Sequence, residues 1–135
     1  MKPLNCIIVD DDEMDRLVVV SYAKRFPQFN IVGIFDSAEK ALTFLDNNKI
    51  EVAFLDIEMP GASGIELRKK ALEIPVCVFV SSHTESAAET FELQTLDFIV
   101  KPFKFPRFEQ TVKRIEEFME IRLKASLFES SIGGD

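Results

Sequence analysis

The residue best placed to carry out chemistry in this sequence is Asp56. The apolar run Val52–Leu55 precedes Asp56, and the turn-forming pair Pro60–Gly61 follows it shortly afterwards. A run of this length is typical of a buried strand, so the carboxylate would stand where a strand ends and a loop begins. Open α/β sheets bind their ligands at that edge. Asp56 is therefore the candidate reactive residue.

Polar side chains end three of the other apolar segments as well. Asp10 and Asp11 follow segment 4–9, Ser81 follows segment 76–80, and Lys101 follows segment 97–100. Neighbouring carboxylates repel one another unless a cation lies among them, and oxygen ligands at a wet edge favour Mg²⁺. A hydroxyl and an ammonium opposite the metal would hold a phosphoryl group. The pattern predicts phosphoryl transfer with Asp56 as the nucleophile.

Alternating strands and helices must position these side chains. The expected strands are 4–9, 29–34, 52–55, 76–80 and 97–100. The expected helices follow the acidic run 10–13, follow a cap at Asp36 or Ser37, span about 63–72 and about 85–93, and include 108–119. Five strands alternating with five helices predict an α/β fold with a parallel sheet covered on both faces. Right-handed crossovers then bring all the strand carboxyl ends to one edge.

Helical spacing predicts which faces of the first and last helices are apolar. In the first helix the apolar residues at this spacing are Met14, Leu17, Val18 and Tyr22, and in the last they are Phe108, Val112, Ile115 and Met119. The tail 130–135 contains Ser and Gly without periodicity, which predicts a linker or a free end.

Length and composition limit the classes of protein. A chain of 135 residues with 47% hydrophobic residues fits one domain with a real core. The net charge of −7 argues against a nucleic-acid clamp and suits a site that collects a divalent cation. Cys6 and Cys77 lie in apolar segments and are expected to be buried, reduced thiols. Without a signal peptide or an apolar run near the ~20 residues of a membrane span, the expected location is the cytoplasm.

Each polar residue also has a purely structural explanation. Asp12 and Asp36 are expected to be helix caps or turn residues, and His83 is expected to be a loop residue and neither a ligand nor a base. Ser81 alone would be a capping hydroxyl, and Lys101 alone a surface charge. The succession of polar residues at one strand end after another favours a functional site over these explanations.

Four segments of this chain resemble receiver domains of two-component response regulators, over about residues 4–123. The segments are Ile-Ile-Val-Asp-Asp at 7–11, Phe-Leu-Asp-Ile-Glu-Met-Pro-Gly-Ala-Ser-Gly at 54–64, Val-Ser-Ser at 80–82 and Phe-Ile-Val-Lys-Pro-Phe at 98–103. The resemblance implies a flavodoxin-like doubly wound sheet of strand order 2-1-3-4-5. It also implies a receiver domain at 1–124 followed by a tail or the start of a linker at 125–135.

The resemblance implies how the phosphoryl group is accepted. Asp56 would take it from a phosphohistidine on a sensor histidine kinase or a phosphotransfer protein. Mg²⁺ would be held by Asp11, Asp56 and the backbone carbonyl of Glu58, with Asp10 helping directly or through water. Lys101 would bridge to the phosphoryl oxygens. The chain would then be a phosphoacceptor that catalyses only its own phosphorylation and dephosphorylation.

Further roles follow from the resemblance. Ser81 would hydrogen-bond the phosphoryl group, and a cis Lys101–Pro102 bond would aim the ammonium into the site. Glu58 and His83 match positions that tune the hydrolysis of the aspartyl phosphate. The switch aromatic is Phe98, which lacks the hydroxyl of the more usual Tyr.

The output would lie elsewhere. Segment 91–108 looks most like receivers joined to LytTR-type DNA-binding domains, and no such module is present, so the chain is either an excised or a stand-alone receiver. Phosphorylation would reshape the surface of the fourth helix, fifth strand and fifth helix. That change would favour a homodimer or release an output domain that regulates transcription. No direct contact with nucleic acid or membrane is expected.

Three alternatives compete with this interpretation. A degenerate receiver would bind partners without phosphorylation, although this chain keeps Asp56 and Lys101. A phosphohydrolase of haloacid-dehalogenase type needs Asp-x-Asp-x-Thr/Val, whereas Met14 occupies the fifth place of a motif that starts at Asp10. A calcium loop at 10–12 lacks the required glycine and follows a strand.

Overall fold

The computed structural model describes residues 2–133. It contains two compact units, one running to Phe103 and the other starting at Lys104. The first unit holds the sheet and the shorter helices. Among the described residues, the second consists of Lys104 and one long helix.

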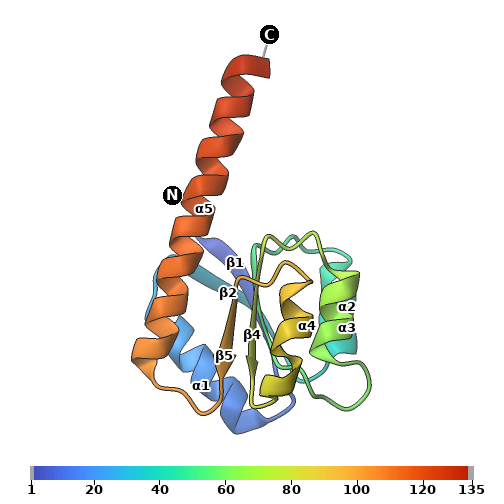
Figure 1. Cartoon of the computed structure of the whole chain (residues 1–135). Helices are drawn as coiled ribbons and strands as arrows, with labels where there is room; N and C mark the ends of the chain where they lie inside the picture. The colour runs from blue at the N-terminus through green and yellow to red at the C-terminus, as the bar shows by residue number, and fades with distance from the viewer. Residues whose placement is uncertain (1, 134–135) are drawn as a thin grey trace. The chain divides into compact units, whose positions relative to one another are not determined.

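The first unit is built on five parallel strands (Figure 1). They are β1 (Leu4–Val9), β2 (Phe29–Phe35), β3 (Val52–Leu55), β4 (Val76–Ser81) and β5 (Asp97–Val100). Their spatial order is β2-β1-β3-β4-β5, and every neighbouring pair runs parallel. The predicted fold class and strand order are therefore confirmed.

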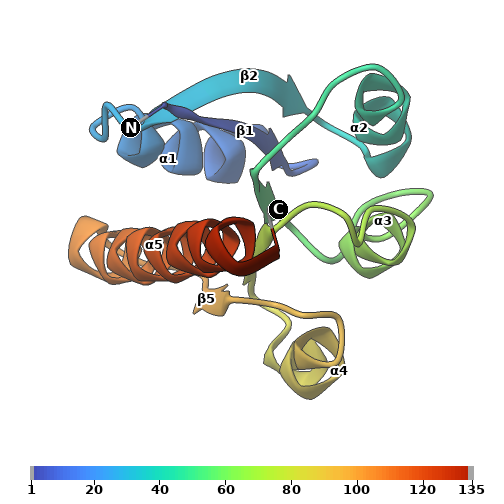
Figure 2. The ribbon, with the colours of Figure 1, turned by 90° about the horizontal axis from the view of Figure 1, so that it is seen from above.

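Helices lie on both faces of this sheet. They are α1 (Glu13–Ala23), α2 (Ala38–Leu45), α3 (Gly64–Lys70) and α4 (Ala87–Phe91), with a 3₁₀ turn η1 (Thr84–Ser86) before α4. Figure 2 shows α1 on one face and α2, α3 and α4 on the other. Ser37 caps α2, and Ser63 with Glu66 forms the predicted capping box at α3. The fourth helix is shorter than predicted because its first turn is 3₁₀.

The central strands form the core because they are apolar along almost their whole length. All residues of β3 and β4 are buried, and so are all residues of β1 except Asn5. Strands covered on both faces need such continuous apolar runs. Cys6 and Cys77 are buried free thiols, as predicted, and burial raises the pKa of both to about 12.

A buried arginine fastens the end of α3 to the loop before β5. The Arg68 side chain is 1% exposed. Its guanidinium donates hydrogen bonds to the backbone carbonyls of Ala71, Ile74 and Leu93 at 3.0, 2.8 and 3.0 Å. Five N–H donors in a rigid fork suit this task, because each bond satisfies a carbonyl where the chain leaves regular structure.

The predicted apolar face of α1 is only partly buried, with Val18 and Tyr22 half-buried. Val19, Val20 and Ala23 are the buried residues, whereas Met14 is 70% and Leu17 is 52% exposed. Segment 17–20 is apolar throughout, so helical spacing fits more than one stripe. The packing of α1 against the sheet selects the stripe nearer the helix C-terminus.

The second unit contains α5 (Phe105–Gly133), which buries Phe108, Val112 and Ile115 as the spacing predicted. The helix continues through 130–133, where an irregular tail was predicted; residues 134–135 lie outside the described part. Extending an existing helix costs little even at Ser, and the Ser131 hydroxyl donates to the Phe128 carbonyl at 2.8 Å. Neither α5 nor any other helix among residues 2–133 is long and apolar enough to cross a membrane.

Candidate phosphoryl-transfer site

Three carboxylates meet at the carboxyl ends of β1 and β3. The two strands are neighbours in register, with Val9 opposite Leu55, and the Asp56 N–H donates to the Val9 carbonyl at 2.9 Å. The residues that follow these two strands therefore lie side by side at the same edge of the sheet. One carboxylate oxygen from each of Asp10, Asp11 and Asp56 lies within 4.8 Å of the others. Asp10 and Asp56 are buried and Asp11 is exposed, which leaves the cluster open to solvent on one side.

The surroundings of Asp56 hold its proton unusually tightly. Burial is the largest cause that raises the pKa of Asp56, to about 7, and the nearby charge of Asp10 adds to it. Lys101 and the hydrogen bond from the Ile57 N–H to Asp56 Oδ1, 2.8 Å long, act in the opposite direction. A divalent cation among these carboxylates would favour the ionised form. Three carboxylate donors around a partly open position fit Mg²⁺.

Lys101 reaches this cluster from the end of β5. Its ammonium lies 2.8 Å from Asp10 Oδ2, 2.9 Å from Asp15 Oδ2 and 3.5 Å from Asp56 Oδ1. Burial lowers the pKa of Lys101, but the hydrogen bonds to Asp10 and Asp15 outweigh it and raise the pKa above its ordinary value. Lys101 is thus a permanent cation at the site. The Lys101–Pro102 bond is cis, as predicted.

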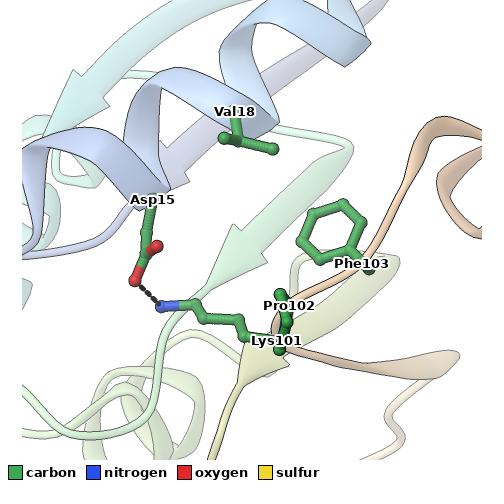
Figure 3. Close-up of a pocket in the computed structure, with 5 residues that line it drawn as sticks. All are labelled: Asp15, Val18, Lys101, Pro102 and Phe103. Atoms are coloured by element: carbon green, nitrogen blue, oxygen red, sulfur yellow. Dashed lines mark hydrogen bonds and ion pairs between the residues drawn. The ribbon is translucent and has the colours of Figure 1, made fainter.

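Asp15 is the site residue that sequence reasoning missed. It projects from the first turn of α1, and Figure 3 shows its ion pair with Lys101. Lys101 also contacts Asp10, so the two carboxylates share one ammonium. Together with Val18, Pro102 and Phe103, this ion pair lines a pocket of about 80 Å³. An acidic residue in a first helical turn is common because it suits the helix dipole, so Asp15 attracted no attention.

Ser81 and His83 shape the loop that follows β4. Ser81 is buried, and its hydroxyl accepts a hydrogen bond from the His83 N–H at 3.0 Å. The His83 ring lies between two carboxylates, with Nε2 2.6 Å from Glu58 Oε2 and Nδ1 3.2 Å from Glu85 Oε1. His83 is a loop residue, as predicted, and its ring joins the loops after β3 and β4.

Segment 57–64 lies close to the acidic cluster but does not cover it. Asp11, Glu58, Met59, Pro60 and Ser63 line an open hollow of about 450 Å³ beside the cluster. At Gly64, the first residue of α3, an added Cβ would stand 1.8 Å from the Asp56 carbonyl oxygen. Only glycine allows α3 to begin this close to the acidic strand end.

The remaining residues singled out from the sequence lie at the edges of this arrangement. Asp12 caps α1 by accepting from the Asp15 N–H, as predicted. Asp36 pairs with Lys40 at 2.9 Å on the surface before α2. Phe98 is 8% exposed and packs in the hydrophobic core on β5.

Comparison with known proteins places this geometry in a family. The family model described as the response regulator receiver domain matches residues 6–113. The transcriptional regulatory protein YpdB of Escherichia coli K12 is 32% identical over 116 residues, covering 84% of this chain and 48% of YpdB. The sensory transduction protein LytT of Bacillus anthracis is 33% identical over 117 residues, with 84% and 48% covered. The predicted resemblance to receivers of LytTR-type regulators is confirmed.

A solved structure agrees with this result. The response regulatory domain of protein mrkE from Klebsiella pneumoniae superposes with a TM-score of 0.78 at 30% identity, covering 87% of this chain and 97% of that chain. This chain spans about half the length of the curated relatives that it matches. On the family match and on the fold, the chain belongs to the response regulator receiver domain family of two-component systems.

Proposed function

We propose that this chain receives a phosphoryl group on Asp56 from a phosphohistidine of a sensor histidine kinase or phosphotransfer protein. The observation that carries the proposal is the acidic cluster with Lys101 beside it. Two of its members, Asp10 and Asp56, are buried, and Lys101 lies 3.5 Å from Asp56. Such groups are costly to bury together unless they serve a ligand. Phosphorelay is the general role of the family.

The transfer needs one nucleophile and one leaving group. Asp56 Oδ1 accepts the Ile57 N–H, so Oδ2 is the oxygen that attacks phosphorus. As the new O–P bond forms, the P–N bond to the donor imidazole breaks, and its electron pair stays on the imidazole nitrogen. Phosphoryl transfer of this kind depends on positioning and on stabilising the equatorial oxygens. Lys101, 3.5 Å from Asp56 Oδ1, supports this role, and the Ser81 hydroxyl would exchange the His83 N–H for the phosphoryl group to share it.

Asp10, Asp11, Asp56 and the backbone carbonyl of Glu58 would hold Mg²⁺. The bound ion would neutralise part of the charge on the phosphoryl oxygens and keep Asp56 ionised. Asp11 is exposed and so offers a ligand that solvent can reach, whereas Asp10 is buried.

Phosphorylation would change the partners of two side chains. It adds about −1.5 to −2 charge at Asp56. Lys101 would turn from Asp15 towards the phosphoryl oxygens, and the Ser81 hydroxyl would exchange the His83 N–H for the same group. The loop after β4, and with it η1 and α4, would then repack beside Phe98. We propose that partners detect this change. The result would be dimerisation or the release of a LytTR-type output domain outside this chain. Both would take place in the cytoplasm.

Intact mass spectrometry tests the proposal directly. The chain is incubated with acetyl phosphate and Mg²⁺, beside the Asp56→Asn variant and a sample containing EDTA. We expect one added phosphoryl group in the parent protein and none in either control. Absence of the adduct under all conditions would instead favour a receiver-like interaction module that acts without phosphorylation.

A further inference from the structure

The C-terminal half of α5 carries apolar side chains that no described residue covers. Ile121, Leu123, Leu127, Phe128 and Ile132 are each at least half exposed. Contiguous apolar surface of this kind on a charged helix marks a contact surface. The question is which of these side chains form one stripe and what covers it.

One stripe has the spacing of a coiled coil. Its members alternate three and four residues apart, at positions a and d of a heptad: Phe118, Ile121, Ala125, Phe128 and Ile132. All of them lie within the helix α5. The stretch 117–132 is about 24 Å long at 1.5 Å per residue. Leu123 and Leu127 fall on the opposite side of the helix and outside this stripe.

The charges that flank the stripe select a second copy as the occupant. Positions g are Glu117 and Lys124, and positions e are Arg122 and Glu129. In a parallel pair, each g residue faces the e residue five positions later on the other helix. Glu117 would then face Arg122 of the second copy, and Lys124 would face its Glu129. Both pairs are of opposite charge, in both directions.

Within one copy of the chain, Lys124 remains free to pair with a charged side chain of a second helix. Lys124 contacts Glu120 at 3.1 Å, and both side chains are more than half exposed, so this pair is held weakly. Lys124 can therefore turn towards a partner helix with little loss.

We propose that residues 117–132 of α5 form a parallel two-stranded coiled coil with a second copy of this chain, whether or not Asp56 is phosphorylated. The proposal goes beyond the receiver function, because it concerns a permanent association and not the switch. It places the two chains side by side with their C-termini at the same end.

Sedimentation equilibrium of the whole chain in EDTA, without a phosphodonor, tests the association at about 5 to 500 µM. We expect a monomer–dimer equilibrium. Phe128→Glu should weaken it by about 30-fold or more, since the charge enters the stripe. Leu127→Glu is the matched control, because Leu127 is 61% and Phe128 is 64% exposed, and it should weaken the dimer by less than about threefold.

Two results would overturn the association. One is a monomer throughout this range, and the other is an equal loss in the two variants. A dimer that appears only after phosphorylation would also refute this proposal, while leaving the receiver function intact.

The orientation has its own tests. Arg122→Glu should weaken the dimer, and Arg122→Glu combined with Glu117→Lys should restore it. Under mild oxidation Ile132→Cys should form a disulfide between copies, whereas Ser126→Cys, on the outer face, should not. A dimer that Ile132→Cys fails to crosslink, or that the double variant fails to restore, would refute the parallel arrangement.

Discussion

Removing the charge of Asp56 should stabilise the metal-free protein, although the residue is central to the proposed function. In Asp56→Asn the shape of the side chain stays almost the same, and the amide oxygen can still accept the Ile57 N–H. Lys101 keeps its closer partners Asp10 and Asp15. What disappears is a carboxylate whose pKa is raised from 3.8 to about 7, first by burial and then by Asp10.

The size of the effect follows from this pKa. Between pH 3.8 and about 7 the folded state holds a proton that the unfolded state has lost. The stabilisation from this proton is complete below the unfolded pKa and is lost as the pH rises through the folded pKa. At about 1.36 kcal/mol per unit, the loss approaches 4 kcal/mol at pH 8 and is about 1.5 kcal/mol at pH 5. Asp56→Asn should recover most of it.

Urea denaturation in EDTA at pH 5 and pH 8 measures the effect. The free energy of unfolding of Asp56→Asn should exceed that of the parent protein by about 2 to 4 kcal/mol at pH 8 and by clearly less at pH 5. Mg²⁺ should then stabilise the parent at pH 8 more than the variant. Asp46→Asn, at the exposed end of α2, is the control and should change stability by the same small amount at both pH values.

Two outcomes would refute the reasoning. If Asp56→Asn destabilises the protein at pH 8, the ionised Asp56 carboxylate does not lower the free energy of unfolding of the parent protein. If the gain is equal at pH 5 and pH 8, the stabilisation does not come from the raised pKa. Either result would also weaken the argument that the cluster is built for a cation.

Three further substitutions test the surroundings of the site. Gly64→Ala should destabilise the protein by about 3 kcal/mol, because the added methyl group would meet the Asp56 carbonyl, and thermal unfolding would show it. Arg68→Met removes the donors to three backbone carbonyls and should cost about 3 kcal/mol in urea denaturation; a change below about 1 kcal/mol would contradict the role given to Arg68. Asp15→Asn should raise the rate of phosphorylation by acetyl phosphate about threefold in a mass-spectrometric time course, because Lys101 loses a competing partner, whereas Asp15→Glu should stay near the parent rate.

Several features could be predicted because local patterns determine them. The runs of β1, β3 and β4 are apolar except for Asn5 in β1 and the terminal Ser81 in β4, so they predict central strands. Asp10 and Asp56 directly follow two of these runs, and parallel strands necessarily end at the same edge. The caps at Ser37 and Ser63 are likewise local, since a side chain bonds a backbone group three residues away.

The buried face of α1 and the end of α5 could not be predicted, because the local sequence fits two different structures equally well. The run of apolar residues 17–20 fits more than one buried face of α1, and the sheet surface decides between them. The Ser residues near the end of α5 are weak helix formers, yet the preceding turns carry the helix through them.

The sequence by itself determined the sheet, the family and the three carboxylates at one edge, because apolar periodicity and strand-end residues are written into neighbouring positions. Only the tertiary structure decided the partners of those groups. Lys101 meets Asp15 across 86 positions of sequence, and Arg68 meets Leu93 across 25. Such contacts depend on how elements far apart in the chain pack against one sheet. Local sequence patterns carry no information about such long-range contacts.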